Sequence, residues 1–172
     1  MAIALLLTTV LALAGFLATS AQGFAVAAGM SASPLAAKLL VTRHVGMAVP
    51  TVLLSLFSQS MVIFYFIGTG KLVKDEVAGY PDAERARILR ALSGFKRRTS
   101  PPATCALLSA IAVFVLGGAA HTRFVPPWVH LAASVAAVLL HGWALVAEWH
   151  VFGENTALMN DPRAWARRAL SG

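Results

Sequence analysis

Long apolar stretches alternate with short polar segments along the chain, and this alternation predicts four membrane-spanning helices. A bilayer core of roughly 30 Å is crossed by about 20 apolar residues in a helix. Stretches of that length lie at about residues 2–28, 43–68, 102–121 and 128–151. We therefore predict an all-α integral membrane protein, a bundle of four transmembrane helices that forms one membrane domain over residues 1–172.

The first apolar stretch runs from Ala2 to about Met30 without a charged side chain. We interpret it as the first spanning helix. A cleaved secretory signal is the competing interpretation, because the small residues at Ala18–Ala21 resemble a cleavage site, although the positively charged start of a signal is missing. Cleavage would leave the topology of the other three spans unchanged.

The second span follows a connection at Gly29–Pro34 and contains a proline. Pro50 is expected to kink this helix rather than end it, because neighbouring helices in a membrane satisfy the carbonyl that a proline frees. The helix is expected to end at Gly68–Lys71, where glycines and a lysine follow an aromatic run.

The longest polar segment, residues 71–101, is predicted to be a cytoplasmic loop. It holds eight of the 14 basic residues: Lys71, Lys74, Arg85, Arg87, Arg90, Lys96, Arg97 and Arg98. Lys and Arg favour the cytoplasmic side of a membrane. A helix start at Pro81–Asp82 and apolar residues at helical spacing before Gly94 predict a short amphipathic helix on the membrane surface. Pro101–Pro102 are expected to separate it from the third span.

The remaining basic residues favour the same topology. The tail at residues 153–172 adds Arg163, Arg167 and Arg168, whereas the two other connections hold only Lys38, Arg43 and Arg123. We therefore expect both termini inside, in a membrane such as the bacterial inner membrane.

Composition supports a lipid environment. The chain is 58% hydrophobic and 12% charged, with a mean hydropathy of +0.74, which excludes an ordinary soluble domain. The basic residues behind the net charge of +7 gather in the segments that are predicted to be cytoplasmic. We therefore expect contact with the bilayer and no nucleic-acid partner. A single cysteine, Cys105, excludes an intrachain disulfide and a cysteine-based metal cage within one subunit.

Two of the spans carry a stripe of polar and small residues at alternating steps of four and three. In the fourth span the stripe is His130, Ser134, Ala137, His141, Ala144 and Glu148. In the second span it is His44, Ala48, Thr51, Ser55, Ser58, Val62, Tyr65 and Thr69. Because ionisable side chains in a membrane normally face other helices, we expect the two stripes to face each other, with His141 level with Ser55.

Three histidines from three spans, His44, His121 and His130, are expected to converge towards the outer face. Imidazole is a ligand for haem iron and for other metals, and we favour haem b held by His44 with His130 or His121. Gly46, Gly117 and Gly118 would leave room for a macrocycle, and Phe124 and Trp128 would contact its ring. Arg43, Arg123 and Lys38 would accompany its propionates. The layout resembles that of small b-type cytochromes and of the membrane anchors of quinone oxidoreductases, without a shared motif.

His141 lies near the middle of its span and requires a partner. A structural hydrogen bond to Ser55 or Ser58 is the simplest one. The other interpretations are a second haem ligand site, which would lack another histidine at this depth, and a quinone or proton site that includes Glu148, Ser55 and Tyr65.

Two alternatives to an electron-transfer protein stay open. The chain could be a non-catalytic subunit or scaffold of a membrane complex or homo-oligomer, docking a partner or anionic lipid through Arg85, Arg87 and Arg90. It could also be a small proton-linked transporter that uses His141 and Glu148. The sequence names no reaction, so enzymatic activity is left undetermined.

Overall fold

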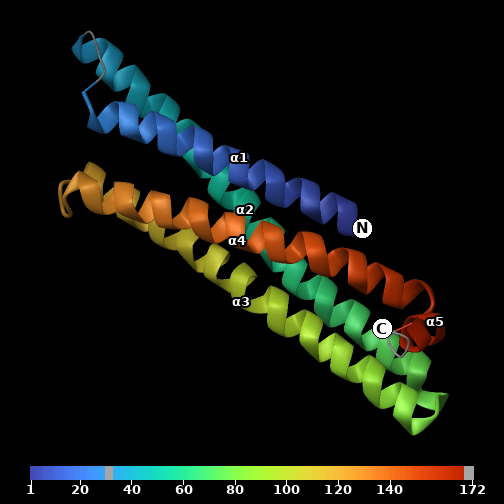
Figure 1. Ribbon diagram of the computed structural model, residues 1–172. Coiled ribbons are helices and arrows are strands. Elements are labelled where there is room, and N and C mark those ends of the chain that lie inside the picture. The colour runs from blue at the N-terminus through green and yellow to red at the C-terminus, as the bar shows by residue number, and fades with distance from the viewer. Residues whose placement is uncertain (30–32, 169–172) are drawn as a thin grey trace.

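The computed structural model describes residues 1–29 and 33–168; 93% of these residues are helical, and none of them is in a strand. Four long helices dominate the molecule (Figure 1): α1 (Ala2–Ala27), α2 (Pro34–Glu76), α3 (Asp82–His121) and α4 (Pro127–Asn160). A 3-10 turn, η1 (Val77–Gly79), joins α2 to α3, and the short helix α5 (Pro162–Arg168) follows α4. All four long helices are long and apolar enough to cross a membrane.

Each long helix packs against two others: α1 and α3 both contact α2 and α4. This arrangement sets α2 and α4 across from each other. We call the end that carries the α2–α3 turn and α5 the basic end. The opposite end, where α1 meets α2 and α3 meets α4, is called the histidine end because it holds His44 and His130.

Buried residues recur at steps of four and three along every long helix. In α1 they are Leu5, Thr9, Ala12, Phe16 and Thr19. In α4 they include Ser134, Ala137, His141, Ala144 and Glu148, as the polar stripe predicted. A spacing of about 3.5 residues keeps one narrow face turned inward over the whole helix length, as in coiled coils. We call these inward faces the seam.

Small residues bring the helices close together at the seam. A Cβ atom on Gly15 of α1 would lie 2.6 Å from Oγ1 of Thr51 on α2, which is closer than real atoms approach. Ala106, Ala110, Ala137 and Ala144 are completely buried. Packing of this kind, through small residues, is typical of helices that associate in membranes.

The segment at residues 71–101 is not the loop with a separate surface helix that the sequence predicted. α2 continues to Glu76, and α3 begins at Asp82, as expected, but then runs through Pro101 and Pro102 to His121. The prediction was wrong because it relied on the charges and the prolines of this segment and not on the spacing of its apolar residues. The buried positions of α3 keep the same steps across both prolines: Ile88, Leu92, Phe95, Thr99, Pro102, Ala106, Ala110 and Val113.

These apolar side chains therefore bury against other helices instead of lying on lipid. Ile88, Leu92 and Phe95 share a core with Val73 of α2, Phe152 of α4 and Ala166 of α5. The two prolines remove two helix hydrogen bonds, and the uninterrupted packing on both sides of them keeps the helix continuous.

Other helix limits also differ from the prediction. α2 begins at Pro34 rather than near residue 43, because Ser33 caps it and its Oγ accepts a hydrogen bond from the Ala36 amide at 3.2 Å. It passes through Gly68–Lys71, where an end was expected, since Thr69 and Gly70 are buried on the seam. α4 passes residue 151 for the same reason, with Asn155 and Leu158 buried. Pro50 lies within α2 as predicted; residues 30–32 of the preceding connection lie outside the described residues.

The buried core stops short of the histidine end. Its last members there are Thr19, Thr51, Val113 and Ser134. Beyond them, no described residue between Ser20 and Pro50, or between Phe114 and Ala133, is buried. In Figure 1 the α1–α2 ends diverge from the α3–α4 ends on this side. The helices are therefore held together by the rest of the seam.

Replacing Ala137 by leucine should destabilise the protein by about 1–3 kcal/mol, because a completely buried seam position has no space for a larger side chain. Thermal unfolding in mild detergent, followed by circular dichroism, measures the change. The matched control is Ala136→Leu, the same substitution at the exposed neighbouring position. Equal unfolding temperatures for the two variants would contradict the seam packing.

Candidate functional site

Polar side chains occupy four successive levels between α2 and α4. At the histidine end the rings of His44 and His130 face each other edge to face, with centroids 6.1 Å apart and an interplanar angle of 78°. Nδ1 of His44 lies 3.0 Å from the carbonyl oxygen of Thr19 and must donate to it. In a neutral ring, Nε2 of His44 then carries a lone pair that is available to a ligand.

Glycines on the other two helices make room for these rings. A Cβ on Gly23 of α1 would lie 3.1 Å from Cε1 of His44, and a Cβ on Gly117 of α3 would lie 3.1 Å from Cε1 of His130. Gly46 and Gly118, which the sequence also suggested, have open space instead. Gly23 was missed because its role depends on which side chain of α2 lies opposite it.

His121, by contrast, does not form a three-ligand cluster with this pair. It is exposed and lines a groove of about 520 Å³ with Lys38, Thr42 and other residues of α2. Within the described residues, no group of three or more His, Cys, Asp or Glu side chains is arranged to hold a metal ion. Of the three histidines expected to converge, the structure brings together two.

The expected cations flank this end from both connections. Arg43 is exposed, one residue before His44, and Arg123 is exposed after α3. Arg123 has a φ of 62°, and the Phe124 amide that follows it donates to the Ala119 carbonyl at 2.8 Å. This left-handed helix end normally carries glycine, and any other residue costs roughly 1–2 kcal/mol there.

At the next level His141 is completely buried and saturated with partners. Its Nδ1 donates to the Ala137 carbonyl at 2.7 Å, and its Nε2 lies 2.6 Å from Oγ of Ser55, the residue expected at its level. The Phe16 ring covers it, with centroids 4.4 Å apart. Because a carbonyl only accepts, the neutral ring accepts at Nε2 from the Ser55 hydroxyl. This geometry is that of the structural hydrogen bond to Ser55, the simplest of the interpretations of His141.

Two helical turns further, Glu148 lies in a completely buried polar cluster. Its Oε2 accepts a hydrogen bond from Thr9 at 2.8 Å, and Oγ1 of Thr9 lies 2.9 Å from Oγ of Ser58. Gln59 lies beside the carboxyl group. Thr9 and Gln59 were not predicted; their signal was polarity at seam positions within apolar stretches.

The fourth level joins Asn155 to Tyr65 and Thr69. The Asn155 amide donates to the Tyr65 hydroxyl at 3.1 Å and approaches Oγ1 of Thr69 at 3.4 Å. Tyr65 therefore belongs to the Asn155 level, rather than to the site with His141 and Glu148 in which the sequence placed it.

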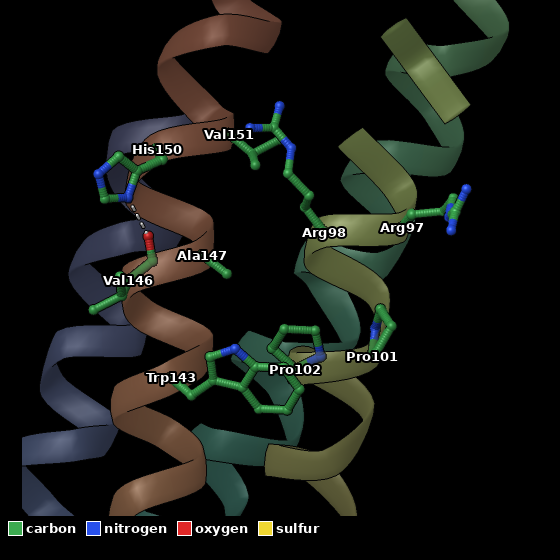
Figure 2. Close-up of a pocket in the computed structure, with 9 residues that line it drawn as sticks. All are labelled: Arg97, Arg98, Pro101, Pro102, Trp143, Val146, Ala147, His150 and Val151. Carbon is green, nitrogen blue, oxygen red and sulfur yellow. Dashed lines mark hydrogen bonds between the residues drawn. The ribbon is translucent and has the colours of Figure 1, made fainter. Parts of the chain in front are cut away.

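The basic end carries an open groove between α3 and α4 (Figure 2). It has a volume of about 450 Å³, with Trp143 and Pro102 at one end and Arg98 at the other. Arg98 makes a bidentate ion pair with Glu154, at 2.6 and 2.8 Å. Nδ1 of His150 donates to the Val146 carbonyl at 2.8 Å. Nearby, Arg87 donates to the Ala166 carbonyl of α5 at 3.0 Å, whereas Arg85 and Arg90 are exposed.

No family model, curated protein or solved structure matches this chain. The four polar levels are therefore the basis on which a function can be assigned.

Replacing Ser55 by alanine should destabilise the protein by about 1 kcal/mol, because Nε2 of His141 loses its partner in a dry interior. Unfolding by denaturing detergent measures the change. Ser109→Ala is the matched control, since the Ser109 hydroxyl bonds only to the Ala106 carbonyl of its own helix. A Ser55 variant as stable as this control would show that the hydrogen bond between Ser55 and His141 does not stabilise the protein.

Proposed function

We propose that this protein is an integral membrane electron-transfer protein that binds one b-type haem between His44 and His130. The observation that carries the proposal is the juxtaposition of these two imidazoles from opposite helices, 6.1 Å apart. Each imidazole could supply one nitrogen ligand to a haem iron held between α2 and α4. Neutral histidines in a helical assembly are the usual ligands of haem b.

The surroundings of the pair are compatible with an added apolar ligand. The buried core ends at Thr19 and Ser134, and none of the described residues beyond them at this end is buried. Gly23 and Gly117 keep the two remaining helices free of side-chain bulk beside the rings. A macrocycle would bury apolar surface there and would require both features.

The charges at this end support the same ligand. Haem propionates require cations or water, and Lys38, Arg43 and Arg123 lie at the histidine end, where both arginines are exposed. The chain keeps an arginine at position 123 although a glycine would relieve the left-handed backbone. Strain retained in this way is typical of residues with a functional role.

The proposal includes a bilayer around the four helices. Large apolar side chains point outward, such as Leu53, Val115 and Leu139, which are 60%, 61% and 68% exposed; lipid would cover them. The distribution of basic residues orients the basic end towards the cytoplasm, with both termini inside, in a membrane such as the bacterial inner membrane. The haem would then lie near the outer face and could exchange electrons with quinone.

A scaffold function explains less. A subunit that only packs or docks would require neither facing imidazoles nor two glycines beside them. Arg87, one of the arginines considered for docking, is used inside the molecule to hold α5.

Haem binding is tested by visible spectra of protein purified from haem-replete cells, oxidised and then reduced with dithionite. The wild type should show a Soret band that sharpens and shifts on reduction. His44→Ala and His130→Ala should each lose it, whereas His121→Ala and His150→Ala should keep it. A colourless wild type, or loss of haem in His121→Ala, would overturn the proposed ligand pair.

The glycine beside His130 gives a second test. Gly117→Ala should weaken haem binding roughly tenfold or more, because overpacking at a tight site costs about 1–3 kcal/mol. Gly118→Ala, which meets open space, should bind haem like the wild type. Haem titration of the purified apoproteins measures both; identical affinities would show that the space beside His130 is not used.

A further inference from the structure

The cluster around Glu148 is separate from the haem site in both place and chemistry. Glu148 follows His130 by 18 residues on α4, which is a distance of about 27 Å along a helix. All seven acidic residues of the chain lie in its described part, and Glu148 is the only one of them that is buried. Its exposed fraction is 0%, as are those of Thr9, Ser58 and Gln59 around it.

The hydrogen bonds of the cluster leave one carboxyl oxygen without a donor. Thr9 gives its single hydroxyl proton to Oε2 of Glu148, and Thr8 gives its own to the Leu5 carbonyl. Ser58 has one proton, which goes to Thr9 or Thr8. Oε1 of Glu148 therefore has no protein hydrogen bond, and neither Oε1 nor Nε2 of Gln59 has one.

No positive side chain of the described residues is placed to balance a carboxylate here. α1 contains no titratable side chain, α2 contains only Tyr65 between Val45 and Gly70, and α3 only Cys105 between Thr99 and Ala120. On α4 itself, His150 is exposed and bonded to its own helix, and His141 lies two turns away with both nitrogens bonded. An unpaired charge buried in hydrocarbon is strongly unfavourable, so the carboxyl group must be neutralised by something that it binds.

We propose that Glu148 is a reversible proton-binding site inside the membrane and that Gln59 is its partner. A proton taken from water forms an O–H bond at Oε1, and the neutral acid then donates to the amide oxygen of Gln59. The acid keeps the hydrogen bond from Thr9 at Oε2. When the proton leaves, the negative charge is held by Thr9 and by the amide group of Gln59, which presents its nitrogen.

A proton fits this site better than a larger ligand. A quinone requires a cavity open to lipid, and Glu148, Thr9 and Gln59 are completely closed off. A sodium ion requires several oxygen ligands directed at one point, whereas Gln59 brings an unpartnered N–H group as well as an oxygen. One amide with both functions free suits a carboxyl group that alternates between donating and accepting.

The next buried polar group with an unpartnered atom lies towards the basic end. On that side, two turns along α4, Asn155 has an oxygen without a partner and contacts the Tyr65 hydroxyl. On the other side His141 has both nitrogens bonded and lies under the Phe16 ring. In the proposed orientation of the chain, this group lies on the cytoplasmic side of Glu148.

Infrared spectroscopy of the full chain in lipid nanodiscs tests the site, because a protonated carboxyl group has a C=O stretch that a carboxylate lacks. The wild type should show such a band, and raising the pH should remove it reversibly. Glu148→Gln, which keeps size and polarity, should lack the band at neutral pH, where exposed carboxyl groups are ionised. Glu154→Gln is the matched control, since this exposed glutamate lies on the same helix and pairs with Arg98; it should keep the band.

Each other outcome has a definite meaning. Absence of the band in the wild type, or a band in it that does not respond to pH, would overturn reversible protonation. A band that NaCl removes at constant pH, while KCl does not, would assign the site to Na⁺ instead. Gln59→Leu should shift the band, and an unshifted band would remove Gln59 as the partner. Visible spectra of the same samples keep the two proposals apart, because Glu148→Gln should leave haem binding unchanged.

Discussion

The spacing of four and three residues along all four helices is the constraint on which the rest of this structure depends. In hydrocarbon there is little gain from moving an apolar side chain from lipid into a protein core, so helices associate through close packing and hydrogen bonds. Both require the same positions to face inward over the whole length of each helix. Every buried residue discussed above, from Thr9 to Asn155, is placed by this periodicity.

The seam also explains why polar groups appear at regular levels. His141, Glu148 and Asn155 follow one another at intervals of seven, so each returns to the same inward face. The α2 residues at the same levels, Ser55, Ser58 and Tyr65, lie on the inward face of that helix as well. A glutamate or histidine one position away from this face would lie towards the apolar outer surface, and in the proposed bilayer its burial would be far more costly.

Much of the fold and of the polar levels could be predicted from the sequence, because polar residues in apolar stretches are conspicuous and the helical period is fixed. The stripe on α4 and the pairing of His141 with Ser55 followed from counting alone. Gln59, Thr9 and Gly23 did not, since their importance depends on which neighbouring helix lies opposite. The helical continuation through Pro101 was missed for a different reason: its signal was the spacing of Ile88, Leu92 and Phe95, hidden among charges.

The gap in packing at the histidine end bears on the order in which the protein is assembled. Because the buried seam ends at Thr19, Thr51, Val113 and Ser134, none of the described residues beyond them at the histidine end contributes to the core. The four helices can thus associate through the rest of the seam alone. The proposed haem would then be the last component to be added, after the helices have associated.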